Sequence, residues 1–579
     1  MKKEKNIKSL LQEELVQSPG RTALKNFFGR KLSVVGMIIF VSIFIACFAL
    51  SALYPIDLQY TDSTRMNLPP TFNYLAVPND LRNNAKAIDL GATFGAGIDK
   101  QGKLHIWGTL TDKLKKVPEN LPPLKDVSCG LDHIVVVTED NKVIAWGNNR
   151  LGITRIPPEV QGKKIVDLQA GYQATMVLDE AGTVHFWGNE SNFSINLYDY
   201  EKQIDQFALN VSTAIALTKD HKVVSLAKGE SLFSEIPDSV QGSAVAVAST
   251  DNVGAALLKD GTVTTWGVQT ADAYSVPEEI QGQVAELKGG RTHFTALLKD
   301  GSVYSWGENY FEQTNYPSVL NGTQIATDYY QNAVIDKDGK VTTWGQKGYL
   351  MGTDQWGRDV FKRVVHGGRV TMTVGFLSVL VSGIIGIIIG GISGYFGGWI
   401  DNLLMRFAEV VSAIPFIPLA IILASIVSGK VSETGRVTMI MIILGLLNWP
   451  GLARLTRAQI LAEKENEFVT AAKAMGIKEA AIIFRHILPN VLAVVLVNLT
   501  LSMASCLLLE SSLSFLGFGI IEPNPTWGNM LNKCIDSVVI KTYWWRWVFP
   551  SLALGLSTIS INLMGDGFRD AIDPKSGER

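Results

Sequence analysis

The sequence is poor in the residues that build disulfide frameworks, metal centres and strongly charged surfaces. It has 4 cysteines and 7 histidines in 579 residues, and only 18% of its residues are charged. The cysteines are widely scattered and the histidines have no metal-ligand spacing, so neither a disulfide framework nor a metal site is predicted. The net charge of −2 favours neither nucleic acid nor a polyacidic partner.

Two functional signals are also missing. The sequence contains no Gly-x4-Gly-Lys-Ser/Thr motif, the loop that cradles nucleotide phosphates, and no catalytic constellation. The chain is therefore not expected to be an enzyme, to hydrolyse ATP itself or to hold a cofactor. A cleavable signal peptide is not expected either, because about thirty polar residues precede the first apolar run and no small-residue cleavage site follows it.

Hydrophobic residues make up 47% of the chain and are distributed unevenly. Residues 32–54 and most of 370–568 are apolar, whereas 72–347 have the composition of a soluble domain. The first apolar run carries no charge and is long enough to cross a bilayer, which takes about twenty residues. Residues 1–31 are rich in Lys and Arg, and such a flank stays on the cytoplasmic side. We therefore predict a transmembrane helix that starts in the cytoplasm.

A short pattern, apolar–x–Trp-Gly, recurs between residues 72 and 347 at a spacing of about forty residues. Its tryptophans are Trp107, Trp146, Trp187, Trp266, Trp306 and Trp344. One double-length gap contains a degenerate copy at residues 223–226. Each copy follows a second apolar strand and a turn such as Asp300-Gly301. Seven such units predict a seven-bladed β-propeller, with positive-φ turns at the hairpin corners and tryptophans between the blades.

The stretch from His293 to Gly307 resembles the regulator-of-chromosome-condensation repeat. Its repetition covers about 276 residues and implies the propeller fold, which hosts many unrelated functions. The loops after each Trp-Gly differ in length and chemistry, and variable loops on a rigid ring form a plausible binding surface.

A second unusual stretch, Glu467–Pro489, lies between two apolar segments but carries six ionisable residues. That load makes burial in hydrocarbon costly, so a water-exposed loop is predicted. We expect a short helix over 470–475, a left-handed cap at Gly476, and a second helix over 477–488 that Pro489 stops. An ordinary amphipathic connector is the alternative.

This segment resembles the cytoplasmic coupling loop, the "EAA" loop, of bacterial ABC-importer permeases. The positions that fit the family pattern are Ala471, Ala472, Gly476, Leu488 and Pro489. Thr470 stands where the family has Glu, and His486 where it usually has Ile. The resemblance implies that these seven residues, within a coupling loop at 459–490, contact ATP-binding subunits. ATP and Mg would be bound by those partner subunits.

In the dipeptide and oligopeptide permeases, Pro-Pro-Ser/Thr runs almost directly into Gly-Thr-Asp-x-x-Gly-Arg-Asp. Here Pro69-Pro70-Thr71 is parted from the second half by the propeller; that half comprises Gly352, Thr353, Asp354, Gly357, Arg358 and Asp359. The chain therefore resembles the C-type permeases of dipeptide, oligopeptide and nickel importers. A complete propeller brings its ends together, so a surface loop between spans one and two can accept it. The resemblance places the chain in the bacterial cell membrane, with the propeller outside.

The expected architecture is an α-helical membrane protein of six spans with an inserted all-β propeller. The spans are predicted at 32–54, 370–393, 403–427 with kinks at Pro415 and Pro418, 437–455 with an interruption at 448–451, 491–509 and 548–563. The domains would be a cytoplasmic segment (1–31), the first helix with the start of its external loop (32–71), the propeller (72–347), the permease core (348–568) and a cytoplasmic tail (569–579). Residues 510–547 are expected as an external loop, and Arg406 is expected to pair with Glu409.

A solute pathway would form with a second homologous permease. Polar side chains on spans five and six are candidate lining residues, although such groups as often bond neighbouring helices. They are Asn498, Thr500, Ser502, Ser505, Ser557, Thr558, Ser560 and Asn562. The resemblance implies oligopeptides or dipeptides delivered by an external binding protein, and nickel complexes or other small solutes are not excluded.

The propeller has three possible roles: docking the binding protein, which we favour, binding a peptide or wall component directly, or rigidifying the outer face. A rival function for the whole chain is a membrane-anchored receptor or adhesin with the propeller as its head. One span would suffice to anchor such a head, so the other five spans and the hairpin argue against it.

Overall fold

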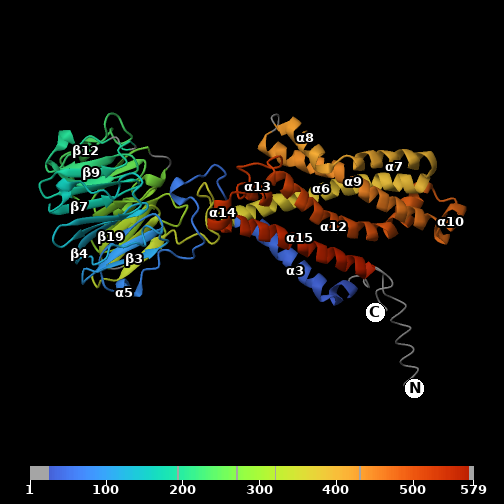
Figure 1. The fold of residues 1–579 in the computed structure, drawn as a ribbon, viewed down its shortest axis with the longest axis horizontal. Coiled ribbons are helices and arrows are strands. Elements are labelled where there is room, and N and C mark those ends of the chain that lie inside the picture. Colours follow the sequence, from blue (N-terminus) through green and yellow to red (C-terminus); the bar gives the residue numbers. More distant parts are fainter. Residues whose placement is uncertain are drawn as a thin grey trace, which may run out of the picture. The chain divides into compact units, whose positions relative to one another are not determined.

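The computed structural model describes residues 25–191, 193, 195–268, 272–319, 321–428 and 432–572. The chain forms two compact units (Figure 1). Pro70–Leu350 is the first, which we call the ring, and the second, the helical unit, combines Met1–Pro69 with Met351–Arg579. Most of the predicted cytoplasmic segment (1–24) and the end of the predicted tail (573–579) lie outside the described residues.

The ring contains seven three-stranded sheets, each built from three consecutive strands. This confirms the predicted seven-bladed propeller. The blades are β1 Ala85–Leu90, β2 Phe94–Asp99, β3 Leu104–Gly108; β4 Leu124–Cys129, β5 His133–Thr138, β6 Val143–Gly147; β7 Ile165–Ala170, β8 Ala174–Asp179, β9 Val184–Gly188; β10 Ile204–Leu209, β11 Ala214–Thr218, β12 Val223–Ser225; β13 Ala244–Ser249, β14 Val253–Leu258, β15 Val263–Gly267; β16 Val284–Gly289, β17 His293–Leu298, β18 Val303–Gly307; β19 Gly322–Asp328, β20 Gln331–Asp336 and β21 Val341–Gly345. One short helix, α5 Asn79–Arg82, precedes β1.

The repeated tryptophans fill the spaces between neighbouring blades, as predicted. Trp306 is buried with Val253 of the preceding blade and Phe294 of its own. The degenerate unit has Leu226 in the equivalent place, fully buried with Phe193 and Phe207. Leu226 thus belongs to the hydrophobic core between two blades, as the tryptophans do.

Side chains on the innermost strands bond the backbone of the next blade. The first strands of successive blades contact one another around the whole ring. Asp89 accepts hydrogen bonds from Cys129 N at 2.8 Å and from Ser128 Oγ at 2.9 Å. Gln169 accepts one from Leu209 N at 2.8 Å. These bonds satisfy N–H groups that would otherwise be unpaired at the edge of each sheet.

The ring closes without exchanging a strand between its first and last blades. Closure comes from side-chain and backbone hydrogen bonds instead: Gln331 Nε2 donates to Gly91 O at 2.8 Å, and Ala85 N donates to Gly339 O at 3.0 Å. The two ends of the ring also meet, because Thr71 N donates to Tyr349 O at 3.0 Å. The insertion therefore begins and ends at one place.

Buried titratable groups of the ring should make its stability depend on pH. Burial raises the pKa of Asp89 from 3.8 to about 6, although hydrogen bonds from Cys129 and Ser128 oppose the shift, so the contribution of Asp89 to stability rises as pH falls through about 6. Burial also lowers the pKa of His133 and His293 from 6.5 to about 4, so these two histidines favour unfolding as pH falls through 6.5. We therefore consider the tryptophan-fluorescence melting temperature of the full-length protein near pH 5 minus that near pH 7.5, a difference that Asp89 should increase and the two histidines should decrease.

Asp89→Asn should reduce this difference in melting temperature, because the amide oxygen still accepts hydrogen bonds but no longer titrates. Asp220→Asn is the matched control, since Asp220 is an exposed carboxyl at a hairpin corner. A pH effect that is the same in both variants would contradict the assignment to Asp89.

The helical unit consists of long apolar helices and several short ones (Figure 1). They are α3 Lys31–Ile45, continued by a π turn Ala46–Leu50 and α4 Ser51–Leu53; α6 Val360–Phe396; α7 Gly398–Ala413; α8 Phe416–Ser428; α9 Glu433–Lys464; α10 Glu467–Ala474; α11 Glu479–Ile482; α12 Leu488–Phe515; α13 Trp527–Asn532; α14 Ser537–Thr542; and α15 Trp545–Ile572. Among the described residues, five helices are long and apolar enough to cross a membrane, and α7 with α8 pass together as a sixth, bent by 83°.

Three predicted boundaries in this unit are wrong. α6 begins ten residues early because Asp359 caps it, accepting hydrogen bonds from Phe361 N at 2.8 Å and Lys362 N at 3.3 Å. α9 runs unbroken through Pro450, since Trp449 and Ala453 pack against α6 and α7 on that turn and tertiary contacts outweigh the lost backbone bond. The predicted external loop is helical at its start, because α12 continues to Phe515.

The third span has one break rather than two kinks. α7 ends at Ala413 and α8 begins at Phe416, so the break lies at Ile414-Pro415. Pro418 is in the first turn of α8, where a missing N–H breaks no bond. The predicted pair of Arg406 and Glu409 is present at 2.7 Å.

Close helix packing fixes which ends of the long helices lie together. α6 approaches α9 at Gly390, where a Cβ would lie 2.4 Å from Ala453 O. α3 runs along α15, and Arg30 and Asp570 form an ion pair beside the stacked rings of Phe27 and Phe568. The described beginning and end of the helical unit thus meet.

Candidate coupling segment and far-end network

The segment between α9 and α12 consists of two short helices joined at a glycine. Gly476 has φ +71°, a left-handed conformation that glycine adopts without steric cost. Its N–H donates to Lys473 O at 2.9 Å, and Ile477 N donates to Ala472 O at 3.1 Å, which closes α10. We call residues 467–487 the coupling segment.

The inner face of the coupling segment is packed against the long helices. Val469, Ala472 and Ile482 are buried in one cluster with Ile460 of α9 and Val491 of α12. Burial of these apolar side chains joins the segment to both helices, so a force on the segment reaches α9 and α12.

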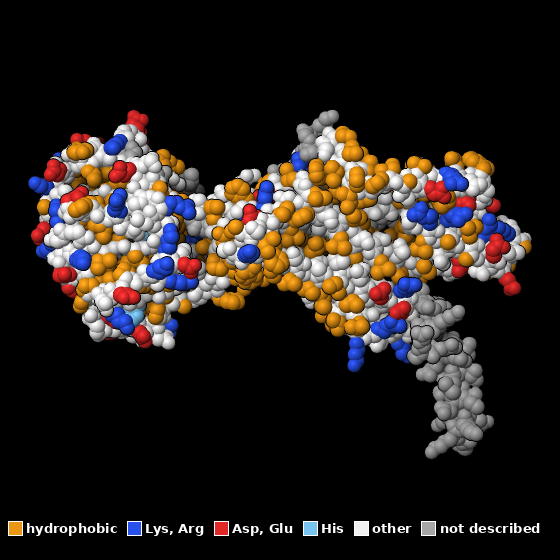
Figure 2. Space-filling model, in the orientation of Figure 1, with side chains coloured by type: hydrophobic (Ala, Val, Ile, Leu, Met, Phe, Trp, Pro, Cys, Tyr) orange, Lys and Arg blue, Asp and Glu red, His pale blue; other side chains and the backbone are white. Residues whose placement is uncertain are grey.

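The outer face of the coupling segment is exposed and mixes apolar and charged residues. Phe468 is 40% exposed and Met475 is 72% exposed, and Thr470 and Ala471 are exposed between them. Figure 2 shows acidic and basic side chains gathered at the end of the helical unit that carries α10, whereas apolar side chains cover its sides. This end is therefore suited to water or to a protein partner.

The predicted coupling residues are distributed over both faces. Thr470, Ala471 and His486 are exposed, Ala472 is buried, and Leu488 is half-buried. Pro489 does not stop the second helix, contrary to the prediction. It lies in the first turn of α12, where proline is tolerated, and a π turn at Ile483–Ile487 leads into that helix without a break.

The second sequence motif forms a tight turn at the opposite end of the helical unit, which we call the far end. Its six residues contain two left-handed glycines (Gly352, Gly357), the bridge between Thr353 and Asp359, and the paired side chains of Asp354 and Arg358. Thr353 N donates to Leu68 O at 2.9 Å. The two halves of the motif therefore meet although the ring separates them in sequence.

A buried ion network at the far end includes two residues that sequence reasoning missed. Arg358 donates to Asp354 Oδ2 and to Glu522 Oε1, both at 2.8 Å. Arg363 lies 3.6 Å from Asp354 and donates to Pro523 O at 3.4 Å. Glu522 is 164 positions from Arg358, so only the fold reveals this pairing. The network joins the start of α6 to the loop after α12.

The predicted pathway residues differ in exposure and in hydrogen bonding. Thr500 and Thr558 donate to the carbonyls of Leu496 and Leu554 in their own helices. Ser560 is buried where α15 approaches Gly36 of α3. Of the others, Ser557 is buried, Asn498 and Ser502 are half-buried, and Ser505 and Asn562 are exposed. Contact of these residues with solute stays a prediction.

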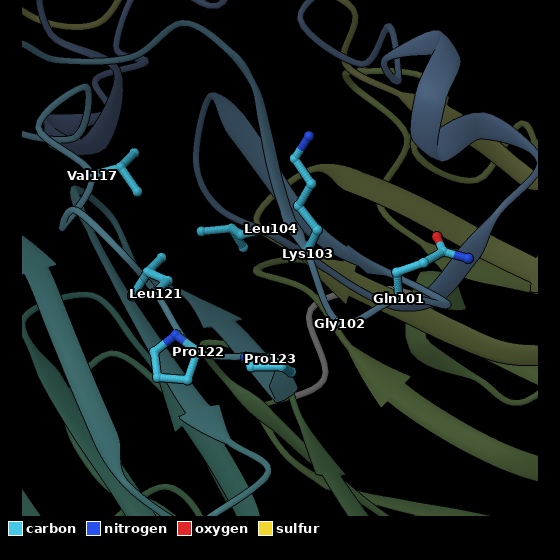
Figure 3. Close-up of a pocket in the computed structure, with 8 residues that line it drawn as sticks. All are labelled: Gln101, Gly102, Lys103, Leu104, Val117, Leu121, Pro122 and Pro123. Carbon is cyan, nitrogen blue, oxygen red and sulfur yellow. The ribbon is translucent and has the colours of Figure 1, made fainter.

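The ring carries a shallow hollow of about 270 Å³ between the β2–β3 hairpin and residues 117–123. Figure 3 shows Leu104 pointing toward Val117 and Leu121, with Lys103 pointing away. Ligand sites usually combine an apolar lining with a few convergent polar groups. This lining has no such convergence and therefore supports no functional assignment.

Comparisons with known proteins match both units. Residues 386–577 match the binding-protein-dependent transport system inner membrane component, and residues 18–70 match the N-terminal TM domain of oligopeptide transport permease C. Residues 124–153 and 284–313 match the regulator of chromosome condensation (RCC1) repeat. A putative peptide permease protein of Brucella suis is 41% identical over 228 residues, which are 39% of this chain and 74% of that protein. This chain belongs to the binding-protein-dependent transport permeases.

Two further relatives of the permease are named for peptide transport. The dipeptide transport system permease protein DppC of Bacillus subtilis is 39% identical over 227 residues, 39% of this chain and 69% of that protein. The oligopeptide transport system permease protein OppC of Haemophilus influenzae is 41% identical over 227 residues, which are 39% of this chain and 70% of that protein. The chain is thus a multi-pass component of the bacterial inner membrane and the membrane subunit of an ABC importer, which also contains other subunits.

Solved structures resemble each unit of the permease separately. The match to the CRINKLY WD40 ectodomain of the Arabidopsis thaliana receptor kinase ACR4 covers 46% of this chain and 97% of the ectodomain chain, at 16% identity and a TM-score of 0.37. The match to a chain of the MetNI methionine ABC transporter covers 36% of this chain and 96% of that chain, at 20% identity and a TM-score of 0.29. Both scores are low, and the fold rests on the sheets and helices described above.

The coupling segment lies in the part of the permease that the family shares, residues 386–577. The ring does not. Since 228 residues are 74% of the Brucella protein, that relative has about 308 residues. A permease core together with an insertion from Pro70 to Leu350 would exceed this length.

Proposed function

We propose that this permease imports oligopeptides or dipeptides and that its coupling segment binds the ATP-binding subunits. The observation that carries the proposal is the two-sided coupling segment, with Val469 and Ala472 buried against α9 and α12 while Phe468 and Met475 are exposed. Exposed apolar side chains beside charges are typical of protein-binding surfaces. The peptide substrate is supported by the names of relatives that cover this part of the chain.

Movement of the ATP-binding subunits would reach the membrane through α12. Closure of two such subunits on ATP displaces the coupling segment, whose buried face is joined to α12 at Val491. Because the π turn at Ile483–Ile487 leads directly into α12, no flexible joint absorbs this displacement. α12 then tilts as a rigid lever. The pathway that opens would be shared with a second, homologous permease.

The proposed topology follows from placing the coupling segment in the cytoplasm. The described termini, Arg30 and Asp570, would lie on the same side, because α15 runs antiparallel to α12, with Gly565 close to Leu501. The far end and the ring, which joins it at Leu68 and Thr353, would then be extracytoplasmic.

We also propose that the ring docks an external substrate-binding protein. Five of its large exposed apolar side chains lie in the loops that follow the third strand of a blade: Leu151, Tyr198, Leu232, Val268 and Tyr310. Strand alternation places the starts of these loops on one face of the ring.

Co-purification tests the transporter assignment. A tagged chain isolated from membranes should bring down ATP-binding chains and a second permease, whereas an adhesin would bring down neither. Phe468→Asp with Met475→Asp should release the ATP-binding chains, because both changes place charge on the exposed apolar face, while the second permease remains bound. Glu465→Gln, an exposed change on the turn before α10, is the control. Isolation of the chain alone would contradict the proposal.

A further inference from the structure

A carboxyl group is fully buried near the far end of α12 and has no cationic partner among the described residues. Glu510 is 0% exposed and lies one and a half turns before the helix ends at Phe515. A buried carboxylate requires strong compensation by hydrogen bonds. An ionisable group in a membrane-spanning helix is also a default functional candidate.

Four hydroxyl groups provide that compensation. Ser514 Oγ donates to Glu510 Oε1 at 2.7 Å, and Ser511 Oγ donates to Oε2 at 3.3 Å. The hydroxyls of Thr371 in α6 and Thr526 at the N-cap of α13 also bond the carboxyl. The two oxygens of a carboxyl group can accept several such hydrogen bonds at once.

Three of these hydroxyls in turn accept hydrogen bonds from backbone N–H groups of the loop after α12 and of α13. Ile520 N donates to Ser514 Oγ at 3.0 Å, and Asn529 N donates to Thr526 Oγ1 at 3.1 Å. Trp527 N donates to Thr371 Oγ1 at 3.3 Å. A hydroxyl that receives an N–H still has its one proton to give, and Glu510 receives it.

These bonds form a clasp centred on Glu510 that holds residues 516–532, the far-end segment, against α6 and α12. The approach is close, because a Cβ at Gly528 would lie 2.3 Å from Ser511 O. Trp527 is fully buried and donates from Nε1 to Val364 O of α6 at 2.9 Å. An amide at position 510 would replace one of the two acceptor oxygens by a donor and leave hydroxyl protons without acceptors.

We propose that Glu510 is a positioning residue for transport, whose carboxyl group fixes the far-end segment where solute is received from the binding protein. This inference rests on the proposed function for its topology. Glu510 does not contact solute in this proposal. It acts through the hydroxyls of Thr371, Ser514 and Thr526, and the far-end ion network at Glu522 belongs to the segment that it holds.

A native cysteine reports the position of the far-end segment. Cys534 lies directly after α13, is 7% exposed and donates from Sγ to Met530 O at 3.4 Å. Cys129 is buried in the ring, and Cys47 and Cys506 are buried in membrane-spanning helices. The rate at which a membrane-impermeant maleimide modifies Cys534, read by peptide mass spectrometry, therefore measures opening of the segment.

The test uses Glu510→Gln in the assembled transporter in membrane vesicles. We expect Cys534 modification to accelerate at least about tenfold, the factor for losing one hydrogen bond at a buried site. The concentration of loaded binding protein for half-maximal uptake should rise by a similar factor, with the yield of assembled complex unchanged. Ser512→Ala is the control, because Ser512 Oγ donates to Leu508 O and takes no part in the clasp.

Ser514→Ala provides a second test if the Gln variant fails to fold. It removes one donor to Glu510 and the acceptor of Ile520 N, so a smaller increase in both quantities is expected. Unchanged Cys534 modification and unchanged half-maximal concentration in an intact complex would overturn the role of Glu510. Absence of ATP-binding chains from the preparation would instead refute the proposed function on which it rests.

Discussion

Gly476→Val is expected to abolish ATP-driven uptake while leaving the chain in the membrane and the ring folded. The reason is backbone conformation rather than crowding, because a Cβ at Gly476 meets no atom within 4 Å. Its φ of +71° costs an L-residue about 1–2 kcal/mol, and a β-branched side chain more. Valine would move this residue to negative φ and change the angle between α10 and α11. The outer face would then no longer fit its partner.

Uptake of labelled peptide into right-side-out or reconstituted vesicles that contain ATP measures this effect, with surface expression and tryptophan fluorescence as checks on insertion and ring folding. Gly476→Asn is the matched control, since asparagine tolerates the left-handed region and should retain most uptake. Normal uptake in the valine variant would refute the coupling role. Modification of a cysteine at Lys478 by an impermeant reagent added outside intact cells would place the coupling segment on the wrong side of the membrane.

We expect that deletion of residues 72–347 of the ring, with Thr71 joined to Gly348, leaves a transporter that assembles but receives less solute from the binding protein. The junction requires no stretching, because a Cβ at Gly348 would lie 2.2 Å from Thr71 O. In the helical unit, the hydrogen bonds from Thr353 N to Leu68 O and from Asn67 N to Asp354 O do not involve the ring and should persist. The loss concerns only the surface that we propose for docking.

We expect uptake at limiting binding protein to fall about tenfold or more in the deletion, the factor for losing a few interface residues. Binding-protein affinity for the purified complex should fall with it, and ATP-binding chains should still co-purify. Tyr198→Ser with Tyr310→Ser is a milder variant that keeps the ring and removes two of its most exposed aromatic side chains. Unchanged uptake and unchanged binding in the deletion would leave only a rigidifying role for the ring.

The sequence predicted the ring well because each blade repeats the same local chemistry. Trp-Gly and the hairpin turns recur at a fixed period, so the blade without tryptophan could be located by spacing alone, and Leu226 indeed fills that place. The hydrogen bonds between blades were not predicted. Gln169 and Leu209 are 40 positions apart, and nothing in either local sequence indicates that they meet.

In the helical unit, predictions from the local sequence were wrong where contacts with residues distant in sequence determine the structure. Pro450 was expected to interrupt a span, but the packing of Trp449 and Ala453 against neighbouring helices keeps the helix continuous. The predicted external loop begins at Glu510, whereas the structure buries this residue in α12. Its compensating hydroxyls include Thr371 and Thr526, which come from α6 and α13 and cannot be paired with it by pattern. The coupling helices and their glycine depend on neighbouring residues and were predicted, apart from the effect of Pro489.

The manner in which the ring closes bears on how the protein is made. Every blade is assembled from three strands adjacent in sequence, and no early strand waits for a late one to complete its sheet. In the proposed topology, each blade can therefore form as soon as its own residues emerge from the translocation channel, stacking on the one before it. Only the final docking of β20 beside Gly91 and Ala92, and the meeting of Tyr349 with Thr71, require the whole insert. The ring would thus fold in steps of about forty residues, and the second span would enter the bilayer after the ring has closed.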